Sequence, residues 1–518
     1  MTRFEPVGVA FEALPARSDF LARYRQGRAQ VVWTRLIADL ETPVSAALKL
    51  GEGRPMSCLL ESVEGGAVRG RYSIIGIAPD VVWRASGAIA EVNRQALTDA
   101  HAFQPEPPPT LRSLRAFLAN SRIDLPAELP PIAAGVIGYM GYDTVRLVEH
   151  LPLCKPDALG IPDSIFVRPT LMVVFDSVKD EMIVVTPVYP RADVDGRAAY
   201  DAALARLRSV VAALDQPLPH ATSLTGAELA LPTPVSNTTP EAFMGMVARA
   251  KEYIAAGDAF QIVLSQRFSA PFALPSFALY RALRRTNPSP FLFHLDFGAF
   301  SLVGSSPELL VRVRDGEVTI RPLAGTRRRG STPAEDKALE QELLADPKER
   351  AEHLMLLDLG RNDVGRVSEI GSVRVTESFA IERYSHVMHM VSHVVGRLAR
   401  KHDVIDALLA GFPAGTLSGA PKVRAMQIID ELEKEKRGPY AGCVGYFSAD
   451  GEMDSCIVLR TALVKDGRIA VQAGAGIVAD SDPRAEQQEC EFKARALFKA
   501  AEEAVRFAKL SGRARSSR

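Results

Sequence analysis

The chain has 518 residues, 47% of them hydrophobic, which is enough apolar material for a large core and for two or three domains. Its 62 basic and 62 acidic residues cancel, which excludes the broad positive field that binds nucleic acid or an anionic membrane. The N-terminal segment lacks a signal-peptide core, and the longest apolar runs are too short to cross a bilayer. Five cysteines without a CxxC pair indicate reduced thiols, so we expect a cytoplasmic protein without disulfides or a zinc site.

The first part of the chain is dominated by short apolar or alternating runs that Gly, Pro and Asp separate. This pattern predicts strands at 73–79, 132–142, 164–176 and 181–189. Ala, Leu and Val then recur at helical spacing, which predicts a helix over 197–213. Pro-rich passages at 103–111 and 214–240 interrupt these elements, and the second has neither a helical nor a strand period.

The second half of the chain mixes both periods. Helical spacing predicts helices near 240–256, 276–286, 335–346, 402–411, 421–435 and 484–508. Strand-like runs lie at 299–305, 317–323, 443–448, 456–464 and 468–478. Short Gly or Asp turns join many of these runs, which predicts antiparallel hairpins. The expected fold class is therefore α+β, with large antiparallel β-sheets packed together and flanked by helices.

The second Pro-rich passage is the best domain boundary. We divide the chain into an N-terminal extension (1–32), an N-terminal domain (33–215), a linker (216–240), a second domain (241–505) and a basic tail expected to be disordered (506–518).

Two acidic doublets stand out: Glu349 with Glu352, and Glu486 with Glu489. The i, i+3 spacing places both carboxylates of a doublet on one helix face, where they repel each other and where a bound cation would remove the repulsion. Oxygen ligands of this kind suit Mg²⁺. The spacing alone also fits a solvated helix face, with Glu489 paired to Lys493 one turn further on.

Other segments carry weaker signals. The glycine-rich stretch 411–433 runs into an amphipathic helix and is either a structural turn or an anion-binding loop. Arg460 interrupts an apolar strand and needs an acidic partner or ligand. Gly474 and Gly476 would let a ligand approach a strand closely. His386, His389 and His393 fit one face of a helix, but their β-branched neighbours fit a strand at least as well.

Taken together, these segments resemble the chorismate-utilising enzymes, most closely the large component of anthranilate synthase. The resemblance runs from about residue 33 to about residue 500. Its dense motifs are SSPELLV, IRPLAGTRRRG, AEHLMLLDLGRND, GTLSGAPKVRAM, RGPYAGCVGYF, DSCIVLRTA and QAGAGIVADSDP, in the order of the family. It implies the family fold, with residues 241–505 as a chorismate-binding catalytic domain.

The resemblance also implies a magnesium-dependent reaction in which ammonia adds at C2 of chorismate, the C4 hydroxyl leaves, and pyruvate is then eliminated to form anthranilate. Glu352 and Glu489 would bind Mg²⁺ directly, with Glu349 and Glu486 acting through water. The residues that match substrate-binding positions are Thr416, Tyr440, Arg460, Gly474, Gly476 and Lys493. Glu308 matches the acid that protonates the leaving hydroxyl, and burial must raise its pKa for that role.

Further family positions bear on the reaction. His389 matches a histidine of the elimination step, and Thr416 and Gln261 are assigned to the catalytic group. Aminodeoxychorismate synthases often carry a lysine nucleophile where this chain has Ala324, and isochorismate synthases carry a lysine base where it has Gln261. Neither alanine nor glutamine can perform those reactions, which favours ammonia as the nucleophile.

The N-terminal domain, together with residues 290–292 of the second domain, resembles the part of the family that binds tryptophan as a feedback inhibitor. The matching residues are Leu60, Glu61, Ser62, Arg71, Tyr72, Ser73, Pro290, Phe291 and Leu292. The chain lacks the GxCxG elbow of a glutaminase, which implies that a separate glutamine amidotransferase subunit supplies ammonia in a hetero-oligomer. Two alternatives remain: an aminodeoxychorismate synthase, and a non-catalytic tryptophan-binding subunit.

Overall fold

The computed structural model describes residues 11–51, 54–64, 68–152, 155–219, 233–384 and 387–516. Within these ranges, no helix combines the length and the apolar character that a membrane crossing requires. His386 and Cys154 lie outside the described residues.

The helices predicted from spacing are all present, with ends shifted by a few residues. The described α-helices are α1 (Arg17–Arg25), α2 (Pro43–Gly51), α3 (Thr110–Ala119), α4 (Gly196–Leu214), α5 (Pro240–Ala255), α6 (Ser276–Thr286), α7 (Pro333–Ala345), α8 (Pro347–Gly365), α9 (Val404–Gly411), α10 (Gly415–Ser418), α11 (Lys422–Leu432) and α12 (Pro483–Ser516). Helix α12 continues beyond residue 505, over part of the segment for which the sequence predicted a disordered tail. Phe507 in this part packs against Arg285, which gives the extra helical turns a contact.

The strands form antiparallel pairs throughout the described residues, as the hairpin signals predicted. They are β1 (Gln30–Ile37), β2 (Ser57–Glu64), β3 (Val68–Ser86), β4 (Ile89–Asn93), β5 (Phe103–Pro105), β6 (Gly135–Met140), β7 (Ser164–Asp176), β8 (Glu181–Val188), β9 (Val235–Ser236), β10 (Gln261–Pro271), β11 (Phe291–Asp296), β12 (Ser301–Ser306), β13 (Leu309–Arg314), β14 (Glu317–Ile320), β15 (Leu323–Arg328), β16 (Arg374–Arg383), β17 (Val387–Arg397), β18 (Gly419–Ala420), β19 (Cys443–Ser448), β20 (Met453–Ile457), β21 (Thr461–Lys465) and β22 (Arg468–Ile477). The α+β class is thus confirmed.

One predicted strand, 456–464, is wrong as a single element. The backbone breaks between β20 and β21, where Arg460 adopts the left-handed conformation with a φ of 47°. The break changes the partners of the chain: β20 pairs with β13 and β19, whereas β21 pairs with β12 and β22. Both strands are buried, so apolar residues continue across the break. The hydrophobic pattern of the sequence therefore did not reveal it.

Strands from the two sides of the 216–240 linker pair directly with each other. Strand β2 lies between β3 and β11, and β6 lies between β7 and β19. The N-terminal and C-terminal regions therefore share sheets and a core. The division into two domains therefore remains a prediction from the sequence.

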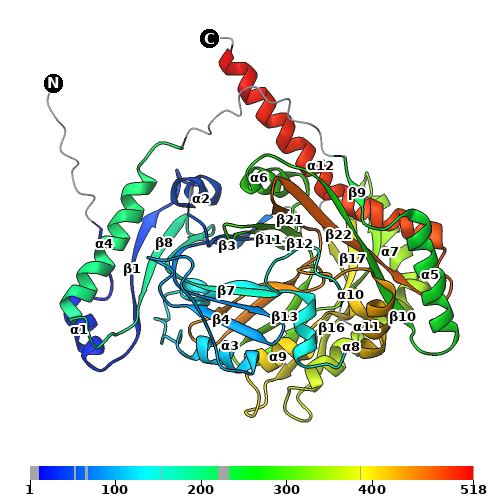
Figure 1. Ribbon diagram of the computed structural model, residues 1–518, viewed down its shortest axis with the longest axis horizontal. Helices are drawn as coiled ribbons and strands as arrows, with labels where there is room; N and C mark the ends of the chain where they lie inside the picture. Colours follow the sequence, from blue (N-terminus) through cyan, green and yellow to red (C-terminus); the bar gives the residue numbers. More distant parts are fainter. Residues whose placement is uncertain are drawn as a thin grey trace.

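Three large apolar cores and a small one of Leu343, Met388 and Met390 lie within the described residues. One large core lies between strands, and the other two lie between strand faces and helices; α1, α4, α6 and α12 contribute to one of these, α3 and α9 to the other, and α11 to both. Figure 1 shows α4 and α12 on one side of the strands and α3, α8 and α9 on the opposite side. Strand β10 alternates accordingly: Ile262 and Leu264 face the α12 core, and Val263 faces the α9 core.

A close approach between β6 and β7 predicts that a side chain at Gly138 lowers the stability of the chain. A Cβ on Gly138 of β6 would lie 2.0 Å from the carbonyl oxygen of Ile165 on β7, which no relaxation of a side chain can relieve. We expect Gly138→Ala to lower the free energy of unfolding by about 1–3 kcal/mol or more. Gly245→Ala on the exposed face of α5, where nothing lies within 4 Å, is the control. Chemical unfolding of both variants checks this, and equal stabilities would contradict it.

Candidate active site

Glu308 occupies the turn between β12 and β13, and its side chain is buried, with 7% of the residue exposed. The hydroxyl of Thr416 on α10 donates to this carboxyl group, at 3.1 Å from one oxygen and 3.2 Å from the other. The sequence assigned both residues to the reaction, and the fold brings them into contact across 108 residues of chain.

Burial raises the pKa of Glu308 to about 8. The hydrogen bond from Thr416, a backbone N–H from Leu323 and the charges of Arg460 and Arg321 lower it, but desolvation dominates. Glu308 is therefore a protonated carboxylic acid at neutral pH, the state that a general acid requires.

Glu308 opens into a small cavity between the strands and α8. Its lining includes Arg321, Leu356, Gly360, Gly415 and Thr416. Most of these groups are apolar or backbone, so the cavity combines a low dielectric with a few polar groups, as ligand sites do.

Arg460 supplies positive charge at the same place. Burial lowers the pKa of its guanidinium, which the nearby Tyr384 and Glu308 partly offset. Among the described residues, its side chain has no hydrogen bond or ion pair that satisfies normal distance criteria, although its carbonyl accepts a hydrogen bond from Ser305. A half-buried guanidinium of this kind is suited to an external carboxylate.

His389 lies on β17, which confirms the strand interpretation of the histidine segment. Its Nδ1 is 3.0 Å from the carbonyl oxygen of Gly325 and 3.0 Å from Oγ1 of Thr326. Burial lowers the pKa of the imidazole to about 4, so the ring is neutral at pH 7. Because the carbonyl requires a donor, Nδ1 carries the proton and Nε2 is an acceptor, and Nε2 is buried without a partner among the described residues.

Gln261 at the start of β10 connects this region to the predicted metal ligands. Its amide nitrogen donates to Glu352 at 3.2 Å, while its Oε1 is buried and has no partner among the described residues. A Cβ at the neighbouring Gly476 would lie 2.8 Å from Nε2 of Gln261 and would force this amide to move. Glycine at 476 therefore makes room for the Gln261 side chain.

The two acidic doublets lie on α8 and α12, and their charges influence each other. Desolvation raises the pKa of Glu352, and the charges of Glu349 and Glu489 raise it further. Glu486 also has a raised pKa, caused by burial and by Glu489. The two distant segments are therefore close enough for their charges to interact.

The acidic side chains do not form a ready-made metal cluster, since no group of three candidate ligands is assembled within the described ranges. Glu349 instead accepts from Arg327 at 2.9 Å, and Glu489 pairs with Lys493 at 2.7 Å. The solvated ion pair that spacing left open for Glu489 is thus present. Lys493 also donates to the carbonyl of Gly474 at 3.0 Å, which ties α12 to β22.

Tyr440 and Gly474 complete the group of predicted substrate positions. A Cβ at Gly474 would lie 2.8 Å from the hydroxyl oxygen of the buried Tyr440, so glycine allows this ring to reach the strand. Gly325 lies between His389 and Glu349. Its carbonyl contacts His389, and a Cβ at this position would lie 3.1 Å from Oε2 of Glu349.

Sequence reasoning missed Arg321, Thr326, Arg327 and Tyr384. Arg321 and Tyr384 stand near Glu308, Thr326 contacts His389, and Arg327 contacts Glu349. Three of them belong to the IRPLAGTRRRG motif, which signalled the region without indicating which side chains turn inward.

The nine residues predicted for an inhibitor site meet on β2, β3 and β11, but they lie on two faces. Phe291 pairs with Ser62, and Leu292 pairs with Glu61. Leu60, Tyr72 and Phe291 pack with Tyr446 on the core between strands, whereas Leu292 belongs to the core under α6. On that second face Ser73 pairs with Glu61, which is buried against Arg284 and Tyr280. Pro290 precedes β11, and Arg71 pairs with Asp176.

The raised pKa of Glu308 predicts a pH-dependent stability. The folded pKa of about 8 lies above the ordinary value of 4.5, so folding takes up a proton between these pH values and stability falls as pH rises across that window. Glu308→Gln removes this loss. We expect its stability relative to the parent to increase between about pH 5 and about pH 9 by a few kcal/mol.

Urea unfolding at both pH values measures this effect. Glu128→Gln at an exposed position is the matched control. The same pH trend in both variants would show that Glu308 is not protonated in the folded chain.

Comparison with known proteins agrees with this geometry. Residues 75–499 match the family model described as chorismate binding enzyme. Anthranilate synthase component 1 of Cereibacter sphaeroides is 57% identical over 94% of this chain and 98% of its own length, and that of Pseudomonas putida is 48% identical over 90% and 93%. The crystal structure of anthranilate synthase component I from Streptococcus pneumoniae TIGR4 aligns with a TM-score of 0.72 and 39% identity over 83% of this chain and 92% of that chain. With its buried acid, free guanidinium and converging carboxylates, the chain belongs to the chorismate-binding enzymes, in the family of anthranilate synthase component 1.

Proposed function

We propose that the chain converts chorismate and ammonia to anthranilate and pyruvate. The observation that carries this proposal is Glu308, a buried carboxylic acid that stays protonated at neutral pH beside the unpaired Arg460. Ammonia forms the C2–N bond while the C4–O bond breaks, and Glu308 gives its proton to the departing hydroxyl, which leaves as water. Elimination of pyruvate then restores an aromatic ring.

Different residues would act on different parts of the substrate. The Arg460 guanidinium is suited to the enolpyruvyl carboxylate by charge-assisted hydrogen bonds. Thr416 orients the Glu308 carboxyl through its hydroxyl. Gly474 and Gly476 let the side chains of Tyr440 and Gln261 lie close against β22, where they would flank the substrate. The neutral His389, with an unpartnered Nε2 acceptor, is suited to accept a proton in the elimination step.

Mg²⁺ fits the other end of the site. Burial and, after it, the charges of Glu349 and Glu489 raise the pKa of Glu352, and a divalent cation would offset both effects. The donors are carboxylate oxygens, which Mg²⁺ prefers. Glu352 and Glu489 would hold it, with Glu349 and Glu486 supporting through water. When bound, the ion would neutralise and orient the ring carboxylate of the substrate. Lys493, the partner of Glu489, would contact the same carboxylate.

Ammonia is the nucleophile that best suits the residues present. Gln261 binds Glu352 through its amide and cannot serve as a base for water, and Ala324 on β15 offers no nucleophile. We further propose that a separate glutaminase subunit supplies ammonia in a hetero-oligomer, since the chain has no glutaminase motif of its own.

We also propose that tryptophan inhibits the enzyme at a half-exposed patch formed by Leu60, Ser62, Tyr72, Phe291 and Tyr446. The apolar and aromatic side chains of this patch are suited to an indole ring. Asp454 pairs with Tyr446 in the sheet and is half-buried, and desolvation raises its pKa to about 6. One of its oxygens lies 3.9 Å from Arg314, and the other has no partner among the described residues. Together with Arg314, which donates to the Tyr446 hydroxyl, Asp454 offers charges for the amino and carboxylate groups of the inhibitor.

Glu61 supports this patch from behind instead of facing it. Its carboxylate is engaged by Arg284 at 2.6 and 2.8 Å. An inhibitor on the opposite face of β2 would therefore have no direct contact with the Glu61 carboxylate, which could affect it only through the position of the strand.

The activity is tested with the purified chain, chorismate, Mg²⁺ and an ammonium salt. We expect anthranilate to form, glutamine to fail as a substitute for ammonium, and a chelator to stop turnover. Formation of isochorismate or aminodeoxychorismate as the end product would refute the proposal.

In the same assay, Glu352→Gln should reduce kcat by at least about a hundredfold while the chain stays folded. Calorimetry with Mg²⁺ should show weaker binding to this variant, and unchanged binding would refute the metal assignment. Glu377→Gln, a largely exposed acid on β16, serves as the control.

The inhibitor site is tested with Phe291→Ala. Loss of this ring should raise the tryptophan concentration for half-inhibition by about tenfold, which corresponds to about 1.4 kcal/mol, while activity without tryptophan changes little. Phe507→Ala on α12 is the control because its exposed ring lies outside the patch. Equal inhibition of both variants would place tryptophan elsewhere.

A further inference from the structure

A buried ion pair lies directly behind the substrate positions. Glu433 follows α11, and Arg437 lies four residues further on, shortly before Tyr440. Only 5% of Glu433 and 2% of Arg437 is exposed. Arg437 donates to both carboxylate oxygens, with Nε at 2.9 Å from one and Nη2 at 2.6 Å from the other. This bidentate geometry fixes the orientation of both side chains.

The remaining groups of the pair bind backbone. Arg437 donates through Nη1 to the carbonyl of Leu417 at 2.7 Å and through Nη2 to that of Val263 at 2.6 Å. Glu433 accepts from both the backbone N–H and the hydroxyl of Ser265, each at 2.8 Å. The pair therefore joins α10, β10 and the segment after α11.

Each of these segments carries part of the candidate active site. Leu417 follows Thr416, the partner of Glu308. Val263 pairs with Gly476, and Ser265 pairs with Gly474, in the β10–β22 ladder. The guanidinium of Arg437 also lies over the ring of Tyr440, 5.6 Å from its centroid.

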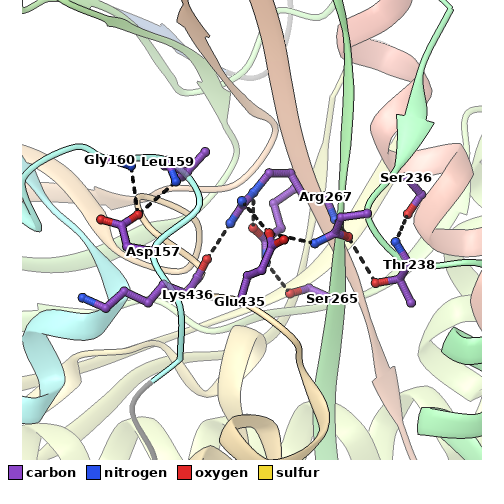
Figure 2. Close-up of polar contacts among 11 residues, drawn as sticks. Asp157, Leu159, Gly160, Ser236, Thr238, Ser265, Arg267, Glu435 and Lys436 are labelled. Carbon is purple, nitrogen blue, oxygen red and sulfur yellow. Dashed lines mark hydrogen bonds and ion pairs between the residues drawn. The ribbon is translucent and has the colours of Figure 1, made fainter.

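A second set of polar contacts holds the pair from the protein surface. Gln472 donates to the hydroxyl of Ser265 at 2.8 Å, and Arg267 donates to Gln472 and pairs with Glu435 at 2.9 Å. Figure 2 shows Arg267 between Ser265 and the Glu435–Lys436 segment. The Glu433–Arg437 pair is thus held from two sides, and its charges have no access to water.

We infer that Glu433 and Arg437 are positioning residues, which set the placement of Thr416 against Glu308 and of Tyr440 against Gly474. A buried ion pair contributes little net stability compared with apolar side chains of equal size, because desolvation offsets the attraction. Its contribution here is geometric: two fixed carbonyl acceptors and one fixed ring keep three separate segments in register. This inference rests on the proposed roles of Thr416 and Tyr440.

The inference predicts the direction in which the pKa of Glu308 changes when the pair is broken. If the carbonyl of Leu417 loses its donor, α10 shifts and the Thr416 hydroxyl moves away from Glu308. That hydrogen bond lowers the pKa of Glu308, so its loss raises the pKa. A purely structural pair would lower stability without moving the pH profile.

The test compares Arg437→Lys with Arg146→Lys. Lysine keeps the charge and loses the fork. Arg146 is the control because it also pairs with an acid of the α11 region, through Nη2 to both oxygens of Asp430 at 2.6 and 2.7 Å, and its hydrogen bonds go to none of the proposed active-site residues. With ammonium as substrate, Arg437→Lys should lower kcat by at least about tenfold and move the alkaline limb of its pH profile to higher pH. Arg146→Lys should lower Tm and leave both unchanged. Matching profiles in the two variants would overturn the inference.

Two further measurements keep the result decisive. If Arg437→Lys does not fold, Ser265→Ala, which removes one donor to Glu433, should show the same changes at smaller size, and unaltered kcat and pH profile would overturn the inference. Amide hydrogen exchange of residues 414–419 should accelerate in Arg437→Lys and not in Arg146→Lys. If the parent chain makes no anthranilate, the proposed function fails, and this exchange measurement alone decides whether the pair holds α10.

Discussion

Exclusion of water from the space around Glu308 is the constraint on which the rest of the site depends. Desolvation makes the carboxyl group an acid with a pKa of about 8, keeps the His389 imidazole neutral, and lowers the pKa of Arg460. The same low dielectric strengthens the attraction between Arg460 and any carboxylate that enters. One physical cause thus accounts for the protonation states on which the proposed roles of these three residues depend.

This exclusion is a property of the layered sheet. Glu308 lies where β12 ends and β13 begins, and β20 and β21 separate at Arg460 on the neighbouring strands. The change of partners between β20 and β21 brings Arg460 near Glu308. Pairing across the linker, β2 with β11 and β6 with β19, makes both halves of the chain part of the same sheet. The N-terminal half is therefore part of the scaffold of the catalytic half.

At the other end of the site, like charges add to desolvation. Burial and the charges of Glu349 and Glu489 raise the pKa of Glu352, while Arg327 and Lys493 pair with Glu349 and Glu489. These counter-charges reduce the repulsion between the carboxylates. The proposed metal would compete with both ion pairs for its ligands.

The sequence by itself determined the α+β class, the positions of the helices with strong apolar spacing, and the family, because local periodicity and motif order are written in neighbouring residues. It also singled out Glu308, Thr416, Gln261 and Glu352, whose contacts are present in the fold. Only the tertiary structure decided that 456–464 breaks at Arg460, that Glu61 faces α6, and that Arg321 lies near Glu308 and Arg327 contacts Glu349. It also placed the Glu433–Arg437 pair against Leu417 and Val263. Those features arise from contacts between residues far apart in the chain, and burial, which sets both pKa values and ion-pair partners, has no local signature in the sequence.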